Sequence, residues 1–200
     1  MIRIVLSEDQ SMLRGALATL LGLEEDIEIL QAVSDGDAAW QLVRDARPDV
    51  LVTDIEMPGR TGIELAEAIV AHELDTKVLI VTTFARPGYL QRAQRAGVHG
   101  YLLKDTPSHE LADVVRKVAR GERHISPELA ELAWTTPDPL SARERQILRL
   151  AEAGLSNKQI ATELSLSVGT IRNYLTDAMH KLSATNRIEA FRSARELGWL

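Results

Sequence analysis

The chain has 200 residues, 45% of them apolar and 26% charged, which is the composition of a globular protein and excludes a disordered one. This length suits one large domain or two small ones. Cysteine is absent, so the chain has no disulfide, no thiolate metal site and no cysteine nucleophile. The net charge of −6 divides unevenly, because residues 1–120 carry −6 and residues 139–200 carry +3. The last third of the chain is therefore the part suited to a polyanion such as nucleic acid.

No segment of the sequence is suited to a membrane. Uninterrupted apolar stretches such as Val78–Val81 are far shorter than the roughly 20 residues of a membrane-spanning helix. Glu8 and Asp9 place acidic groups near the start of the chain, where a signal peptide needs small residues. We therefore expect a cytoplasmic protein that does not insert into a membrane.

Residues 1–120 alternate short apolar segments with longer helical ones. The apolar segments predict five strands, at Ile2–Ser7, Ile27–Val33, Val50–Thr53, Val78–Thr82 and Gly100–Leu103. Helical periodicity predicts five helices, at Gln10–Leu23, Asp37–Asp45, Ile63–Ala71, Gly88–Ala96 and Ser108–Arg120. This alternation is typical of a parallel sheet with helices on both faces, so we expect a five-stranded α/β domain over residues 1–120.

Residues 121–138 lack this alternation. Gly121, Pro127 and Pro137 interrupt the segment, and only residues 128–133 have the pattern of a short helix. We interpret residues 121–138 as a linker between two domains.

Residues 139–200 have a purely helical pattern in which signals for helix starts recur. Three capping residues are each followed three positions later by Glu or Gln: Ser141 by Glu144, Ser156 by Gln159, and Asn186 by Glu189. A further cap, Ser167, precedes a helix that extends to about Leu182, and Gly198 can end the last helix. These signals predict an all-α domain of four helices over residues 139–200.

Acidic side chains follow two of the predicted strands. Glu8 and Asp9 come after the first strand, and Asp54 comes after the third. The carboxyl ends of parallel strands meet at one edge of a sheet, and three carboxylates gathered there repel one another unless a cation lies between them. Mg²⁺ is a hard cation that prefers oxygen ligands. The pattern therefore predicts a Mg²⁺ site with Asp9 and Asp54 as ligands, Glu8 acting through water, and the main-chain carbonyl of Glu56 as a further ligand.

The fourth and fifth strands bring a hydroxyl and an ammonium to the same edge. Thr82 ends the fourth strand and Lys104 follows the fifth. Both can bind an added anion, so the set describes acyl-phosphate formation on Asp54. Taken singly, each of these residues is more often a solvated loop residue or a helix cap. Five of them in order at successive strand ends favour the site.

These motifs resemble the receiver domains of bacterial response regulators. The resemblance is carried by Glu8-Asp9, Asp54–Gly59, Thr82-Thr83 and Gly100–Lys104. It implies a (βα)5 flavodoxin-like fold, phosphorylation of Asp54 by a sensor histidine kinase, and Mg²⁺ held by Glu8, Asp9 and Asp54. It also implies that Thr82, Tyr101 and Lys104 are switch residues; the less favoured alternative for Tyr101 is an aromatic residue of a strand that only packs. Asp105 stands where many receivers have a proline after the lysine.

The C-terminal pattern resembles the helix-turn-helix output domain of the NarL/FixJ (LuxR-type) regulators. The motifs are Leu140–Glu144, Gly154–Ala161, Ser167–Arg172 and Lys181-Leu182. The second helix of such a motif enters the DNA major groove. Three residues share the outward arc of that helix and are the predicted base contacts: Arg172, Asn173 and Thr176. Three others are better placed to contact DNA phosphates: Ser167, Thr170 and Lys181. Tyr174 suits either role. The alternative to DNA binding is a structural helical bundle whose polar face is only solvated.

The two resemblances together cover nearly the whole chain. They imply a transcription regulator that is phosphorylated on aspartate, forms a homodimer and binds double-stranded promoter DNA. The stretch Thr82–Tyr89 resembles a member of the family that controls a fatty-acid desaturase gene, which makes a membrane-lipid desaturase gene the expected target. An aspartyl-phosphate phosphatase is disfavoured because residue 56 is Glu where such enzymes place a second Asp. A module acting only through protein contacts is the third hypothesis, and the intact acidic residues and Lys104 disfavour it.

Overall fold

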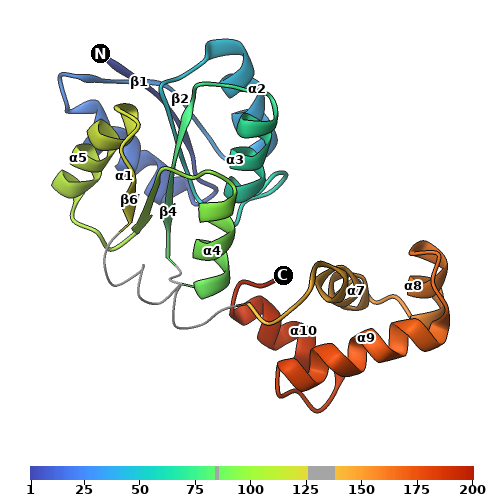
Figure 1. Cartoon of the computed structure of the whole chain (residues 1–200). Coiled ribbons are helices and arrows are strands. Elements are labelled where there is room, and N and C mark those ends of the chain that lie inside the picture. The colour runs from blue at the N-terminus through green and yellow to red at the C-terminus, as the bar shows by residue number, and fades with distance from the viewer. Residues whose placement is uncertain (84–85, 126–137) are drawn as a thin grey trace. The chain divides into compact units, whose positions relative to one another are not determined.

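The computed structural model describes residues 1–83, 86–125 and 138–200. Its contacts divide the chain into two compact units, which are described separately below (Figure 1). The helix expected around residues 128–133, and the larger part of the expected linker, lie outside the described residues. In the described part of the chain, no helix is long and apolar enough to cross a membrane.

The first unit is built on a parallel sheet with the strand order β2-β1-β3-β4-β5-β6. Its strands are β1 (Ile2–Ser7), β2 (Ile27–Val33), β3 (Val50–Thr53), β4 (Lys77–Thr82), β5 (Gly100–Leu103) and β6 (His124–Ile125). The five predicted strands are all present, and only the start of β4 differs, by one residue. All neighbouring strands pair in parallel, as the strand–helix alternation predicts.

The sixth strand corrects the prediction of a five-stranded sheet. β6 contains two residues of the segment interpreted as a linker, and it pairs Gly100 with His124 and Tyr101 with Ile125. The backbone N–H of His124 also donates to the carbonyl of His99 at 2.8 Å. Two residues are too few to form a periodic pattern, so the sequence does not predict this strand and only its pairing with β5 defines it.

Helices cover both faces of the sheet (Figure 1). They are α1 (Ser11–Gly22), α2 (Gly36–Ala46), α3 (Gly62–Ala71), α4 (Pro87–Arg95) and α5 (Ser108–Ala119). α1 and α5 pack on the face formed by Ile4, Leu6 and the residues in register with them. All four residues of β3 are buried, as expected of a central strand that is covered on both sides. The capping box predicted at Thr61 and Glu64 begins α3.

All regular elements of the second unit in the described residues 138–200 are helices. They are α7 (Ala142–Glu152), α8 (Asn157–Glu163), α9 (Val168–Lys181) and α10 (Arg187–Glu196). The predicted capping boxes at Ser141 and Ser156 are both formed. Asn186 caps α10 as predicted, but Glu189 accepts from Thr185 instead of completing a box with Asn186. Apolar residues of all four helices form one core.

Candidate functional site

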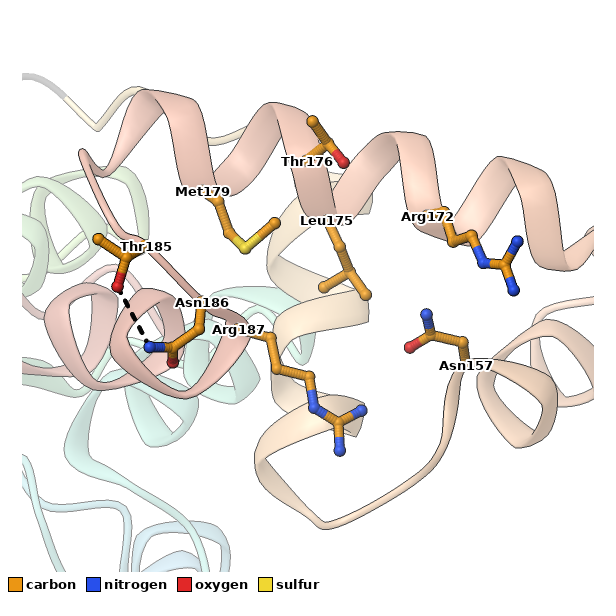
Figure 2. A pocket seen from close by; sticks show the side chains of 8 residues that line it. All are labelled: Asn157, Arg172, Leu175, Thr176, Met179, Thr185, Asn186 and Arg187. Carbon is orange, nitrogen blue, oxygen red and sulfur yellow. Dashed lines mark hydrogen bonds between the residues drawn. The ribbon is translucent and has the colours of Figure 1, made fainter.

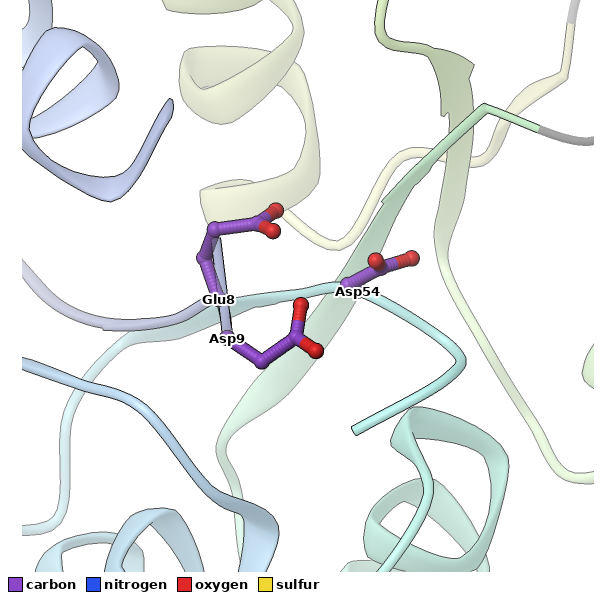
Figure 3. Close-up of side chains that lie close together, drawn as sticks. All are labelled: Glu8, Asp9 and Asp54. Carbon is purple, nitrogen blue, oxygen red and sulfur yellow. The ribbon is translucent and has the colours of Figure 1, made fainter. Parts of the chain in front are cut away.

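Three carboxylates meet at the carboxyl edge of the sheet. Glu8 and Asp9 leave the end of β1 next to Asp54 at the end of β3 (Figure 3). The register pairs Ser7 with Thr53, and the backbone N–H of Asp54 donates to the Ser7 carbonyl at 3.0 Å. One oxygen from each carboxylate lies within 4.8 Å of the others. The geometry therefore confirms the prediction from sequence that these three side chains lie close together.

Lys104 joins the two buried carboxylates of this cluster. Its ammonium lies 2.7 Å from Asp54 Oδ2 and 2.8 Å from Glu8 Oε2, and only 6% of its side chain is exposed. Burial works against the charge of Lys104, but the hydrogen bonds to Asp54 and Glu8 outweigh it and raise the pKa of the amine. Burial also raises the pKa of the Glu8 carboxyl, and the hydrogen bond from Lys104 only partly opposes this. Asp9 is exposed, so it is the carboxylate of the three that faces solvent.

Backbone groups hold the same carboxylates in place. Asp54 Oδ1 accepts from the N–H of Ile55 at 2.6 Å, and Glu8 Oε1 accepts from the N–H of Gln10 at 3.1 Å. Arg14 in α1 donates to the main-chain carbonyl of Glu8 at 2.6 Å. The sequence analysis missed Arg14, and no local motif signals a side chain that reaches back to a strand end.

The loop that follows Asp54 is fixed against the start of α2. The N–H of Gly36 donates to the carbonyl of Pro58 at 3.0 Å, and a Cβ at Gly36 would lie 1.8 Å from the carbonyl oxygen of Arg60. Glycine is therefore required where α2 meets this loop. Met57 points inward and its sulfur accepts from the Ser7 hydroxyl at 3.2 Å. Glu56, the predicted source of a main-chain ligand, lies on the exposed side of the loop.

The predicted switch residues Thr82 and Tyr101 lie inside the sheet layer. Thr82 is 1% exposed at the end of β4, and Tyr101 is fully buried in β5. The bond from Lys104 to Asp105 is trans, and no cis peptide occurs among the described residues. Thr82 is the last residue of β4 and Lys104 directly follows the neighbouring β5, and the N–H of Lys104 donates to the Thr82 carbonyl at 2.8 Å.

In the second unit, α9 presents a polar arc opposite its buried face. Arg172, Asn173 and Thr176 are exposed, whereas Ile171 and Leu175 are buried in the helical core. The arc predicted from helical spacing is therefore formed. Of the other predicted contacts, Ser167 is the exposed N-cap of α9, and its hydroxyl lies 2.8 Å from the hydroxyl of Thr170.

Comparison with known proteins places these two sites in one family. Residues 4–116 match the response regulator receiver domain family, and residues 138–194 match the family of bacterial regulatory proteins, luxR family. The chain belongs to the LuxR-type response regulators. It controls transcription within a two-component system and is not an enzyme, which decides against the phosphatase hypothesis. Membership of this family also excludes the two other hypotheses, a helical bundle with only a structural role and a module that acts only through protein contacts.

Relatives of this response regulator match it over its whole length. It is 49% identical over 199 residues to the transcriptional regulatory protein DesR of Bacillus subtilis strain 168, which covers 100% of this chain and 99% of DesR. It is 48% identical to the uncharacterized transcriptional regulatory protein YvfU of the same strain, with 100% of both chains covered. The crystal structure of the response regulator ChrA of a heme-sensing two-component system is 35% identical, with a TM-score of 0.59 over 100% of this chain and 98% of ChrA.

One predicted DNA contact of the response regulator has a partner inside the protein. The ammonium of Lys181, at the end of α9, donates to both carboxylate oxygens of Glu144 at 2.8 Å. The Glu144 side chain is only 4% exposed and also accepts from the N–H of Ser141. Burial by itself raises the pKa of Glu144, but the hydrogen bonds from Lys181 and Ser141 outweigh it, so the pKa is lowered. Lys181 therefore links α9 to the start of α7.

A groove of about 420 Å³ runs beside the polar arc of α9. Eight residues from α8, α9, α10 and the segment before α10 line it (Figure 2): Asn157, Arg172, Leu175, Thr176, Met179, Thr185, Asn186 and Arg187. Two of them, Arg172 and Thr176, belong to the predicted base contacts. The sequence analysis did not single out Asn157 or Arg187, because the groove exists only once three helices have packed.

Proposed function

We propose that Asp54 is the phosphoacceptor of this response regulator. The observation that carries the proposal is the ammonium of Lys104, which is buried between Asp54 and Glu8 at the carboxyl edge of the sheet. In the transfer from a sensor histidine kinase, an oxygen of Asp54 bonds to phosphorus while the bond from phosphorus to the histidine nitrogen breaks. Lys104 then pairs with the added anion, because a charge-assisted hydrogen bond to a phosphoryl oxygen is strong.

The acidic cluster fits the Mg²⁺ that receiver domains use. The three carboxylates of the cluster offer only oxygen donors, which Mg²⁺ prefers. In the proposed site, Asp9 and Asp54 are direct ligands, Glu8 acts through water, and the main-chain carbonyl of Glu56 is the fourth group. Bound Mg²⁺ neutralises charge on the transferred phosphoryl group. The chain itself fixes the donors through the backbone bonds to Glu8 and Asp54 described above.

Thr82 and Tyr101 are proposed as the residues that report phosphorylation. The Thr82 hydroxyl lies one strand away from Asp54, at the end of β4, where it can donate to the added phosphoryl group. Its movement would change the packing around Tyr101 in the neighbouring strand. Phosphorylation then shifts a pre-existing equilibrium between two arrangements of this part of the sheet.

The second state is proposed to be a homodimer formed through α1 and α5. α1 leaves apolar side chains in water, with Met12 87%, Leu20 39% and Leu23 75% exposed, counting the residue directly after the helix. Burying them against a second copy removes apolar area from water. A dimer brings two α9 helices to half-sites about one helical turn apart.

We propose that the regulator binds double-stranded promoter DNA through α9. Arg172, Asn173 and Thr176 contact base edges, and Ser167 and Thr170 contact the DNA backbone. Lys181 stays a predicted phosphate contact, with the ion pair to Glu144 as a second role. The corresponding domains are a receiver over residues 1–120, a linker over 121–138 and the DNA-binding domain over 139–200.

Two finer predictions concern the cell. A cytoplasmic location agrees with a transcription regulator that has to reach DNA. That the regulated gene encodes a membrane-lipid desaturase stays a prediction, because the target depends on the promoter sequence and the side chains of α9 do not identify that sequence.

The proposal is tested by phosphorylation with a small phosphodonor and Mg²⁺, followed by intact mass and oligomeric state. Wild type should gain one phosphoryl group and dimerise, whereas Asp54→Ala should do neither. Asp45→Ala is the matched control, since Asp45 is an exposed carboxylate of α2 with no ion pair in the described residues. Retention of the added mass in Asp54→Ala would place the acceptor elsewhere.

A further inference from the structure

We propose that Ser7 and Met57 position the main-chain carbonyl of Glu56 for Mg²⁺ through a contact between hydroxyl and sulfur. This role rests on the proposed function, since it concerns the Mg²⁺ site proposed there, and it adds two positioning residues that are not ligands themselves. Ser7 ends β1, and Met57 lies in the loop that follows Asp54. The Ser7 hydroxyl lies 3.2 Å from the Met57 sulfur, and both residues are buried.

The proton of the Ser7 hydroxyl belongs to the sulfur. Two acceptors lie within reach of this hydroxyl, the Met57 sulfur at 3.2 Å and the carbonyl oxygen of Asp35 at 3.4 Å. A distance of 3.4 Å is long for a hydroxyl that donates to oxygen, whereas sulfur is a larger atom and 3.2 Å is a close contact for it. The Asp35 carbonyl also accepts from the N–H of Ala39, so it has another donor. Because a hydroxyl has a single proton, Met57 is its better partner.

Met57 is held by its side chain and not by its backbone. In the described part of the chain, no hydrogen bond involves the backbone N–H or carbonyl of Met57. The Thr53 hydroxyl lies 3.9 Å from the sulfur but donates to the carbonyl of Asp54 at 2.9 Å, which leaves Ser7 as the donor. Burying a hydroxyl without a partner costs free energy. The sulfur therefore explains a serine at the fully buried end of β1.

The position of Met57 sets that of the Glu56 carbonyl, because one peptide bond joins the two residues. A peptide unit is planar and moves as one body. The next backbone anchor along the loop is the Pro58 carbonyl, which accepts from the N–H of Gly36 at 3.0 Å. Mg²⁺ requires nearly ideal octahedral geometry, so an oxygen displaced from its position is a weaker ligand. Loss of the contact between Ser7 and Met57 should therefore lower the affinity for Mg²⁺.

The test is a double-mutant cycle in which calorimetric titration measures the Mg²⁺ affinity of the full chain without a phosphodonor. Ser7→Ala removes the donor, and Met57→Leu removes the acceptor while it keeps the volume of the side chain. Each should weaken Mg²⁺ binding by about twofold to fivefold, the lower range for one hydrogen bond, since sulfur is a weak acceptor. The double variant should bind no more weakly than either single variant, because both substitutions remove the same contact.

Two variants serve as controls. Thr76→Ala removes another buried hydroxyl, which donates to the Pro48 carbonyl at 2.8 Å. Thr76 precedes β4 and so lies at the opposite edge of the sheet from the acidic cluster. Its substitution should lower the melting temperature and leave the Mg²⁺ affinity unchanged. Asp54→Ala should bind Mg²⁺ far more weakly than wild type, which assigns the measured heat to the acidic cluster.

The outcomes separate the contact from the metal site of the proposed function. A wild type that does not bind Mg²⁺ overturns both. Wild-type binding with unchanged affinity in Ser7→Ala and Met57→Leu overturns only the positioning role, even if the melting temperature falls. Effects that multiply in the double variant also overturn it, because the two side chains then act independently. Either single variant tests the contact by itself if the other does not fold.

Discussion

The ion pair between Lys181 and Glu144 leads to a prediction about stability in which the two partners are not equivalent. Glu144 is 4% exposed, whereas the Lys181 side chain is 38% exposed. Lys181→Met leaves a buried carboxylate without its cation. Glu144→Gln leaves an ammonium that can return to water, and a Gln at this position still accepts the N–H of Ser141 in the capping box. The lysine substitution should therefore be the more damaging of the two.

The magnitudes follow from burial. Removing one partner of a fully buried ion pair costs about 3–5 kcal/mol, and the partial exposure of Lys181 reduces this to about 2–3 kcal/mol for Lys181→Met. Glu144→Gln loses one partly exposed ion pair and should cost about 1 kcal/mol. For a domain of this size 1 kcal/mol corresponds to about 4–8 °C. We expect the melting temperature to fall by about 5 °C for Glu144→Gln and by more than about 10 °C for Lys181→Met.

Calorimetry of the full chain measures both shifts near neutral pH, with the transition of the first unit as an internal control. The pKa of Glu144 is lowered from its ordinary value of 4.5, so the pair contributes fully above that pH and its contribution is lost as the pH falls through the folded-state pKa. The difference in melting temperature between wild type and Glu144→Gln should therefore become smaller at acidic pH. A Glu144→Gln protein that is as unstable as Lys181→Met near neutral pH would refute the reasoning from burial.

Three further predictions concern other parts of the chain. Arg172→Ala should cost about 1–3 kcal/mol at the cognate base pair in a binding titration, and an equal loss on random DNA would make Arg172 a phosphate contact. Leu23→Glu should prevent dimerisation in size-exclusion chromatography while leaving phosphoryl uptake by the receiver intact; dimerisation at wild-type concentration would move the interface away from α1. Thr61→Ala removes the N-cap of α3 and should lower the free energy of unfolding by about 1 kcal/mol in urea, whereas Thr61→Ser should restore it.

Most of the fold could be predicted because its signals are local. Each strand of residues 1–120 is a short apolar run, and the caps at Thr61, Ser141 and Ser156 depend on residues three positions apart. The acidic cluster could be predicted as well, since a parallel sheet brings successive strand ends to one edge whatever the intervening helices contain. Glu8 and Asp54 are thus brought together by topology, although they lie 46 positions apart in the chain.

The missed features all depend on contacts between distant segments. β6 forms because His124 and Ile125 reach the free side of β5, and nothing in their own sequence marks a strand. Arg14 reaches the carbonyl of Glu8 because α1 turns back over the end of β1. Predicting either contact requires the packed structure, since the partners share no spacing that a sequence pattern can report.

The basic residues of the second unit show the same limit for function. By sequence, Lys181 and Arg187 are similar, because each is a cation at a helix terminus in a domain that binds a polyanion: Lys181 ends α9 and Arg187 begins α10. Packing separates them, because α7 places the buried carboxylate of Glu144 against Lys181, whereas no acidic side chain of the described residues pairs with Arg187. Position in the sequence therefore indicates which cations can reach DNA, and the packed structure shows which of them, like Lys181, also form an ion pair with a carboxylate of the protein.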